Sequence, residues 1–155
     1  MRTSDAFTVL ELVIVLAVVG ILGTVGFVLM DASRFATTQA ANGLVNSVRR
    51  VRFEAIKENR TAYMTVNGSG YAIWVDRSNS GYPPDAGETV ADVQFGEGSL
   101  QGVFIESSNV STVAFDRRGI PLVGETTPGT IVVSSTRSDF SRTIDISAIG
   151  TAEVQ

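Results

Sequence analysis

Residues 6–30 read AFTVLELVIVLAVVGILGTVGFVLM, and this stretch decides the fold. From Phe7 to Met30 the side chains are apolar or small, and Glu11 is the only ionisable one. As a helix these 24 residues would extend about 36 Å, enough to cross a hydrocarbon layer about 30 Å thick. A cleaved secretory signal is the alternative, but its apolar core has about 7 to 15 residues and ends at an A-x-A pattern, which does not follow here. The stretch therefore predicts a membrane helix.

Composition narrows the chemistry available to the chain. It has 155 residues, about the length of one domain, and a net charge of −4, which argues against general nucleic-acid binding. It contains no cysteine and no histidine. Disulfides, thiolate nucleophiles and the common zinc sites are therefore excluded, and so is the most frequent general base. We expect no cofactor and no metal.

Residues 31–59 have the pattern of an amphipathic helix. Apolar residues recur at helical spacing, while Asn46, Arg50, Glu54 and Lys57 fall on another side. The predicted buried face comprises Ala41, Leu44, Val45, Val48, Val51, Ala55 and Ile56. No proline lies between Phe7 and Tyr82, so one continuous helix is expected, ending near Asn59, which tolerates the left-handed conformation of a helix stop.

After Asn59 the sequence is typical of β-structure. Segments rich in Val, Ile, Thr, Phe and Tyr alternate with turn residues, which predicts strands at 61–66, 71–76, 102–106, 112–116, 130–134 and 143–147. In the second of these, Tyr71, Ile73 and Val75 alternate with Ala72, Trp74 and Asp76, which predicts a strand with two different faces. Residues 78–92 contain Pro83-Pro84 and two glycines and are predicted to form a long loop. The fold class is therefore α+β, a long N-terminal helix packed on an antiparallel β-sheet head.

The N-terminal motif, from Ala6 to Glu11 followed at once by the apolar run, resembles the type IV pilin and pseudopilin superfamily. In that superfamily a short leader ends in a small residue, the mature chain begins with Phe, and its fifth residue is Glu. The resemblance implies cleavage by the prepilin peptidase between Ala6 and Phe7 and N-methylation of Phe7. Two details differ from the common pattern. The residue before the cut is Ala6 where Gly is usual, and the charge of the leader's single arginine is balanced by Asp5.

Glu11 is the candidate assembly residue. A carboxylate within an apolar span costs roughly 2.5 to 3.5 kcal/mol at the helix centre and usually marks a function or a partner. After cleavage, the Phe7 amine of a neighbouring subunit would be that partner. The plain alternative is that Glu11 lies at the level of the lipid headgroups. Gly20, Gly23 and Gly26 would let helices approach closely, or reflect only the general frequency of glycine in membrane helices.

Later markers resemble the pseudopilin H and FimT-like minor pilins. Residues 52–59 match an Arg-x-Glu-Ala-Ile-Lys-x-Asn pattern before the first strand, and residues 115–119 match a Phe-Asp-x-x-Gly turn. The end of the last strand, Ile149-Gly150-Thr151, resembles a terminal strand followed by glycine. The structural reading of 52–59 is an ordinary helix end on the sheet, in which Lys57 offsets the like-charge pair of Glu54 and Glu58.

Two further functions compete with assembly. A FimT-like subunit binding DNA for uptake in natural transformation would use Arg117, Arg118, Arg137 and Arg142, provided that the fold brings them together. Arg50 and Arg52 face about 160° apart on the helix and form no common patch. The other competing function is an enzyme with a membrane anchor, or a Ca²⁺ site at Asp85, Glu88 and Asp92. The spacing of these residues matches no Ca²⁺-loop motif, and a solvated loop is the simpler interpretation of them.

The sequence thus predicts three parts: a leader at 1–6, a transmembrane and assembly helix at 7–30, and an amphipathic helix with a β-rich head at 31–155. The predicted partners are other pilins or pseudopilins, the inner-membrane assembly platform, the prepilin peptidase and the membrane. The predicted location is the bacterial inner membrane, with a single span and the head outside the cytoplasm, and then a type IV pilus or a type II secretion pseudopilus.

Overall fold

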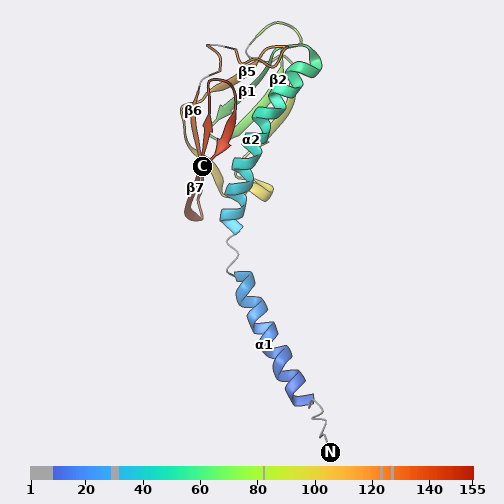
Figure 1. Ribbon diagram of the computed structural model, residues 1–155, viewed down its shortest axis with the longest axis vertical. Helices are drawn as coiled ribbons and strands as arrows, with labels where there is room; N and C mark the ends of the chain where they lie inside the picture. The colour runs from blue at the N-terminus through green and yellow to red at the C-terminus, as the bar shows by residue number, and fades with distance from the viewer. Residues whose placement is uncertain (1–8, 29–31, 82, 123, 127) are drawn as a thin grey trace, which may run out of the picture. The chain divides into compact units, whose positions relative to one another are not determined.

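The computed structural model describes residues 9–28, 32–81, 83–122, 124–126 and 128–155. Its contacts divide the chain into two units, residues 1–32 and residues 33–155. The first unit contains helix α1, Val9–Val28, and the second contains nearly all of helix α2, Ala32–Glu58, and eight β-strands (Figure 1). The expected continuity of the two helices falls on residues 29–31, outside the described residues.

Helix α1 is apolar on all sides. Its large side chains from Val9 to Leu22 are each about half or more exposed in the single chain, with Val9 at 80% and Leu22 at 64%. Within the described residues, no helix combines the length and the apolarity needed to cross a membrane.

Helix α2 ends where the sequence predicts. Asn59 has φ = 53°, the left-handed conformation. The Asn59 N–H donates to the Ile56 carbonyl (3.2 Å) and the Arg60 N–H donates to the Ala55 carbonyl (3.1 Å). These two bonds form a Schellman motif, which satisfies carbonyl groups that the helix end would otherwise leave unpaired.

The buried face of α2 agrees with the prediction except at two positions. Leu44, Val48 and Val51 are at most 1% exposed, but Ile56 is 51% exposed and Glu54, predicted on the polar side, is only 7% exposed. At about 100° per residue, Ile56 lies about 140° around the helix from Val51, whereas Glu54 lies only about 60° from it. The Glu54 carboxylate keeps a partner at this edge, because the Lys57 ammonium donates to it over 2.9 Å, as the sequence predicts.

The head has two antiparallel sheets of four strands. One sheet has the order β3-β2-β1-β5 and the other β4-β6-β7-β8. All six predicted strands exist, with ends shifted by a few residues. The strands are β1 (Ala62–Asn67), β2 (Gly70–Val75), β3 (Thr89–Gln94), β4 (Val103–Ser108), β5 (Thr112–Phe115), β6 (Gly129–Ser135), β7 (Ser138–Ile146) and β8 (Ala152–Val154).

Two strands differ from the prediction. Strand β3 includes the end of the predicted loop at 78–92; it is an edge strand with exposed Thr89, Asp92 and Gln94, so it lacks the alternation of a half-buried strand. The expected strand end at Ile149-Gly150-Thr151 is wrong, because β7 ends at Ile146 and a turn leads into β8. Gly150 makes this turn with φ = 72°.

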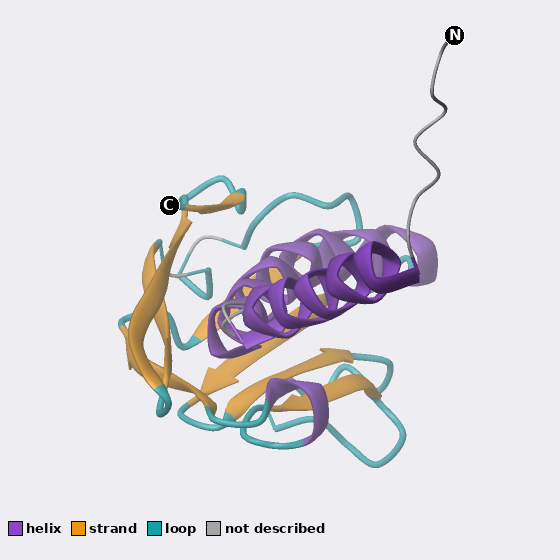
Figure 2. Ribbon diagram, turned by 90° about the horizontal axis from the view of Figure 1, so that it is seen from below, coloured by secondary structure: helices purple, strands orange, loops and turns teal. Residues whose placement is uncertain are grey.

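The core lies between α2 and the inner faces of both sheets, which cover two adjoining sides of the helix (Figure 2). The two faces of β2 are as predicted. Tyr71, Ile73 and Val75 join the main core, whereas Trp74 lies in a smaller cluster on the other face of the sheet. There its ring stacks on Tyr63, with the ring centroids 4.1 Å apart.

The loop before β3 is held by a buried carboxylate, so its prediction as simply solvated is wrong at Glu88. The Glu88 side chain is 3% exposed and accepts N–H bonds from Arg77 and Ser78 (2.8 Å each) and from Asp85 (2.9 Å). These bonds, led by the Asp85 N–H, lower the pKa of Glu88 to about 2. The Arg77 guanidinium donates twice to Glu58 (2.8 and 2.7 Å), which ties the loop to the end of α2 and relieves the repulsion between Glu54 and Glu58.

Gly150 tests the packing between the sheets. A Cβ at this position would lie 2.5 Å from the Phe115 ring, and φ is positive. Gly150→Ala should therefore lower the free energy of unfolding by about 2 to 5 kcal/mol, combining left-handed strain with overpacking. Gly68→Ala, where nothing lies within 4 Å and φ is not in the left-handed range, is the matched control in urea denaturation. Equal midpoints for the two variants would contradict this packing.

Glu88 tests the loop. Because its pKa is lowered in the folded state, its bonds contribute stability above the ordinary value near 4.5, and that contribution is lost as the pH falls from about 4.5 towards about 2. Glu88→Gln should therefore lower the melting temperature at pH 7, and the difference from the unsubstituted chain should shrink as the pH is lowered through that window. Glu97→Gln, at an exposed carboxylate, is the control. A constant difference from pH 7 to pH 2 would contradict the assignment.

Candidate functional site

Glu11 lies in the first turn of α1, among exposed apolar side chains. An acidic residue is favoured at this end of a helix, where the backbone dipole is positive. Its neighbours Leu10 and Leu12 are 70% and 56% exposed. The cleavage and methylation residues, Ala6 and Phe7, lie outside the described residues. The structure therefore places Glu11 in the first turn of an apolar helix.

Helix α1 has no polar face of the kind that keeps an isolated helix soluble in water. A helix that is hydrophobic all round is normally covered by protein or by lipid. Removing each large apolar side chain from water is favourable by about 1.5 to 3 kcal/mol of free energy. Helix α1 is therefore a surface that requires a partner.

Arg117 and Arg118 lie in the predicted Phe-Asp-x-x-Gly turn after β5. The Asp116 carboxylate accepts the N–H groups of Ile120 and Arg118, each over 2.8 Å, and these bonds lower its pKa, the Ile120 bond contributing most. A Cβ at Gly119 would lie 2.8 Å from Cδ1 of Ile56 and 3.0 Å from Nε of Arg52. The turn therefore packs closely against the last turns of α2, which explains the need for glycine.

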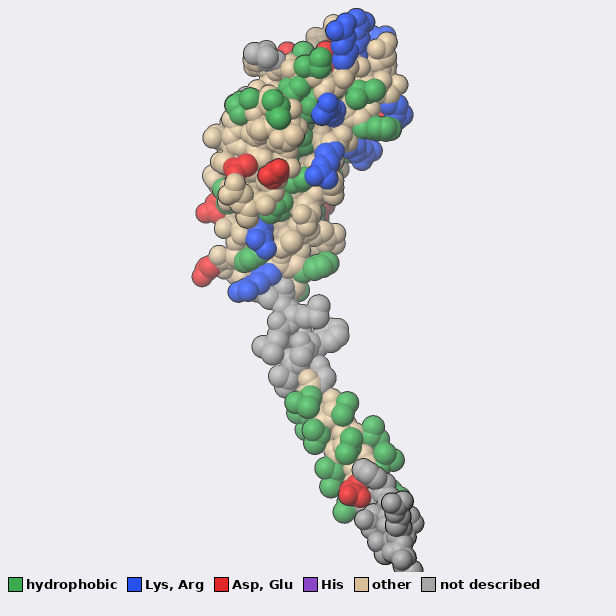
Figure 3. All heavy atoms as spheres, viewed as in Figure 1, with side chains coloured by type: hydrophobic (Ala, Val, Ile, Leu, Met, Phe, Trp, Pro, Cys, Tyr) green, Lys and Arg blue, Asp and Glu red, His purple; other side chains and the backbone are tan. Residues whose placement is uncertain are grey.

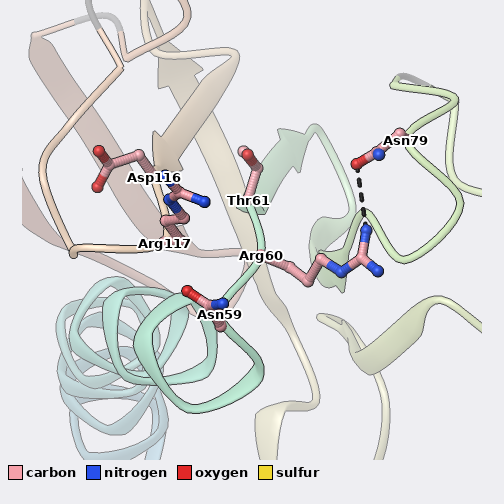
Figure 4. A pocket seen from close by; sticks show the side chains of 6 residues that line it. All are labelled: Asn59, Arg60, Thr61, Asn79, Asp116 and Arg117. Atoms are coloured by element: carbon pink, nitrogen blue, oxygen red, sulfur yellow. Dashed lines mark hydrogen bonds between the residues drawn. The ribbon is translucent and has the colours of Figure 1, made fainter.

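A polar pocket of about 460 Å³ opens beside this turn. It lies where α2 passes into β1, and Figure 4 shows its six lining side chains. Arg60 donates to the Asn79 side-chain oxygen over 3.3 Å, which links the end of α2 to the loop after β2. The lining residues are Asn59, Arg60, Thr61, Asn79, Asp116 and Arg117. The guanidinium groups of Arg60 and Arg117 would attract a small anion in this pocket, whereas the Asp116 carboxylate would repel it.

Arg137 and Arg142 lie at the other end of α2. The guanidinium carbons of Arg142 and Arg34 lie 5.0 Å and 5.5 Å from the centre of the Phe140 ring, so this part of β7 meets the first turn of α2. The turn with Arg117 and Arg118 packs instead at Arg52, 18 residues further along α2, a rise of about 27 Å. The four arginines proposed for DNA binding therefore do not form one patch. Basic side chains on the face in Figure 3 are likewise dispersed along the head.

Over the part of the chain that the structure describes, no group of three or more acidic side chains lies close enough to hold a metal ion. Sequence reasoning missed the roles of Glu88 and Arg77 and the contact of Arg34 with Phe140. The contacts of Arg77 with Glu58 and of Arg34 with Phe140 join distant segments of the chain. Glu88 combines a local bond from Asp85 with bonds from residues 10 and 11 positions away, so no local pattern signals these roles.

Comparisons with known proteins point to one family. The family model described as "Type II transport protein GspH" matches residues 40–150. The Pilin-like protein PilA1 of Thermus thermophilus is 31% identical over 160 residues, which cover 99% of each chain. Two crystal structures of the type IV minor pilin FimU of Pseudomonas aeruginosa share the fold, with TM-scores of 0.50 and 0.53 at 19% and 20% identity. They cover 76% and 79% of this chain, and the matches take in 91% and 90% of theirs.

The family match covers α2 from its ninth residue to the turn before β8, and the relative from Thermus thermophilus aligns with 99% of the chain. Because a family match over most of the chain and an identity above 30% along its whole length agree, the predicted resemblance is confirmed. The chain belongs to the GspH family of the type IV pilin and pseudopilin superfamily, as a minor pilin or pseudopilin subunit.

Proposed function

We propose that the subunit is made as a precursor, anchored in the membrane, and then drawn into a filament. In this proposal prepilin peptidase cuts between Ala6 and Phe7, and Phe7 is then N-methylated. The apolar segment at 7–30 holds the subunit in the inner membrane with the head, 31–155, outside the cytoplasm. The assembly platform then moves it into a type IV pilus or a type II secretion pseudopilus among other pilins. The role is structural and requires no catalysis.

The exposure of apolar side chains all round α1 carries this proposal. Val13, Ile14 and Val15 point to three different sides of the helix, and they are 56%, 54% and 49% exposed. One contact face would cover only one of these sides. Lipid covers all of them, and so does a bundle of neighbouring helices. The same surface therefore serves both stages, in the membrane and in the filament.

Glu11 supplies the specific interaction of the second stage. In lipid its carboxylate is costly, and so is the Phe7 amine left by cleavage. Pairing the two between neighbouring subunits neutralises both charges where the dielectric constant is low. The pair also sets the axial register of one helix against the next, because it forms at only one relative height.

Glu11 substitutions test the proposal in the native host. Glu11→Gln and Glu11→Val should still reach the membrane, but the filament fraction should fall about tenfold or more, since about 1.4 kcal/mol of lost pairing suffices for that factor. Glu11→Asp should lie between, because the charge remains while its reach shortens by one methylene. The measurement is the ratio of filament to membrane protein, with Glu97→Gln in the head as the control for loss of a carboxylate.

Intact mass of the same samples gives the second readout. All variants should begin at Phe7, since the substitution lies beyond the cut. An unchanged filament fraction for Glu11→Val would show that Glu11 is only an interfacial residue. Chains that still begin at Met1 in the assembled fraction would contradict the processing step.

A further inference from the structure

A basic cluster forms where α2 begins. The Ser33 hydroxyl donates to the Ser138 hydroxyl over 2.8 Å and so joins the first turn of α2 to the β6–β7 hairpin. The Phe140 ring has the guanidinium groups of both Arg34 and Arg142 within 5.5 Å of its centre. Arg137 lies exposed at the tip of the same hairpin. We name Arg34, Arg137, Phe140 and Arg142 the basal cluster.

Two arginines of the basal cluster, Arg137 and Arg142, carry positive charge that no ion pair among the described residues neutralises. In the described part of the chain, neither Arg137 nor Arg142 has a carboxylate within ion-pair distance. Nε of Arg142 is buried and meets no hydrogen-bond acceptor among the same residues. The part of the hairpin around its tip, residues 136–142, carries Arg137 and Arg142 against one acidic residue, Asp139. Asp145 lies near the other end of β7 and accepts a hydrogen bond from Gln155. The tip of the hairpin therefore carries one net positive charge in a chain of net charge −4.

Covalent connection fixes where this charge can lie. Arg34 follows the last residue of α1, Val28, by six residues. Even a fully extended chain of that length reaches only about 20 Å. Arg34 therefore lies at most about 20 Å from the end of α1, however the two units are arranged. Phe35, beside Arg34, is 71% exposed and adds an apolar side chain at the same end of the head.

We propose that the basal cluster binds the phosphate groups of anionic phospholipids in the leaflet on the head side of the membrane. The inference rests on the membrane anchoring proposed above. Guanidinium groups bind phosphate through paired N–H donors, and each basic residue near an anionic surface contributes a factor of about five in affinity. Exposed Phe35 suits the boundary between headgroups and acyl chains. The contact holds the base of the head at the membrane until the subunit leaves it.

The test uses the full chain in vesicles of phosphatidylcholine and phosphatidylglycerol in equal amounts. After mild detergent extraction, native mass spectrometry counts the lipids that stay bound to each protein molecule. We expect phosphatidylglycerol to be retained over phosphatidylcholine by at least about fivefold. Added salt should reduce this preference, because the contact is electrostatic. The double variant Arg137→Gln/Arg142→Gln should lower it several-fold, because Arg34 is then the only guanidinium group left in the cluster.

Two variants separate charge from folding. Arg117→Gln/Arg118→Gln removes the same charge at the far end of the head and should leave the preference unchanged. Arg142→Lys keeps the charge while changing the stacking on Phe140, and it should retain most of the preference. An equal loss in the far-end variant, or no loss in the hairpin double variant, would overturn the inference while leaving membrane anchoring intact. A chain that fails to enter vesicles of either lipid would overturn both.

Discussion

Burial of one face of α2 against two sheets is the constraint on which the head depends. Leu44, Val48 and Val51 are almost fully buried, and each contributes about 1.5 to 3 kcal/mol through removal from water. The strands form two separate sheets, and the inner faces of both pack on α2 in one shared core. The details at its end follow from this arrangement. The Schellman stop turns the chain into β1, and the glycine turn after β5 packs on the last helical turns.

The two helices solve different physical problems. Helix α2 has one apolar face, which its own chain covers, whereas α1 is apolar on every side and needs cover from outside the chain. The head of such a subunit buries its own apolar surface, whereas α1 leaves its apolar surface to be covered by lipid or by other subunits.

The sequence predicted most of the fold because most of its signals are local. Helical spacing, Asn59 as the helix stop, the turn at residues 115–119 and six strands are all predicted from patterns within a few residues. The misses have non-local causes. Glu54 and Ile56 exchange roles because the buried arc of α2 is set by both sheets, and strand β3 at an edge has no alternation to read. Glu88 is buried by bonds to segments up to 11 residues away. The functional motif at Ala6, Phe7 and Glu11 is a different case, since it was recognised by resemblance and its assigned roles remain proposals.

The central claim is that the whole circumference of α1 is covered, by lipid before assembly and by other subunits after it. Since the chain has no cysteine, single cysteines at Val13, Ile14, Val15 and Leu16 report on successive directions about 100° apart. Ser80→Cys, at an exposed site at the far end of the head, is the positive control. With a membrane-impermeant maleimide applied to membranes and to isolated filaments, we expect labelling at residue 80 and protection at all four α1 positions in both preparations. Labelling of any α1 position as fast as residue 80 in either preparation would contradict this coverage.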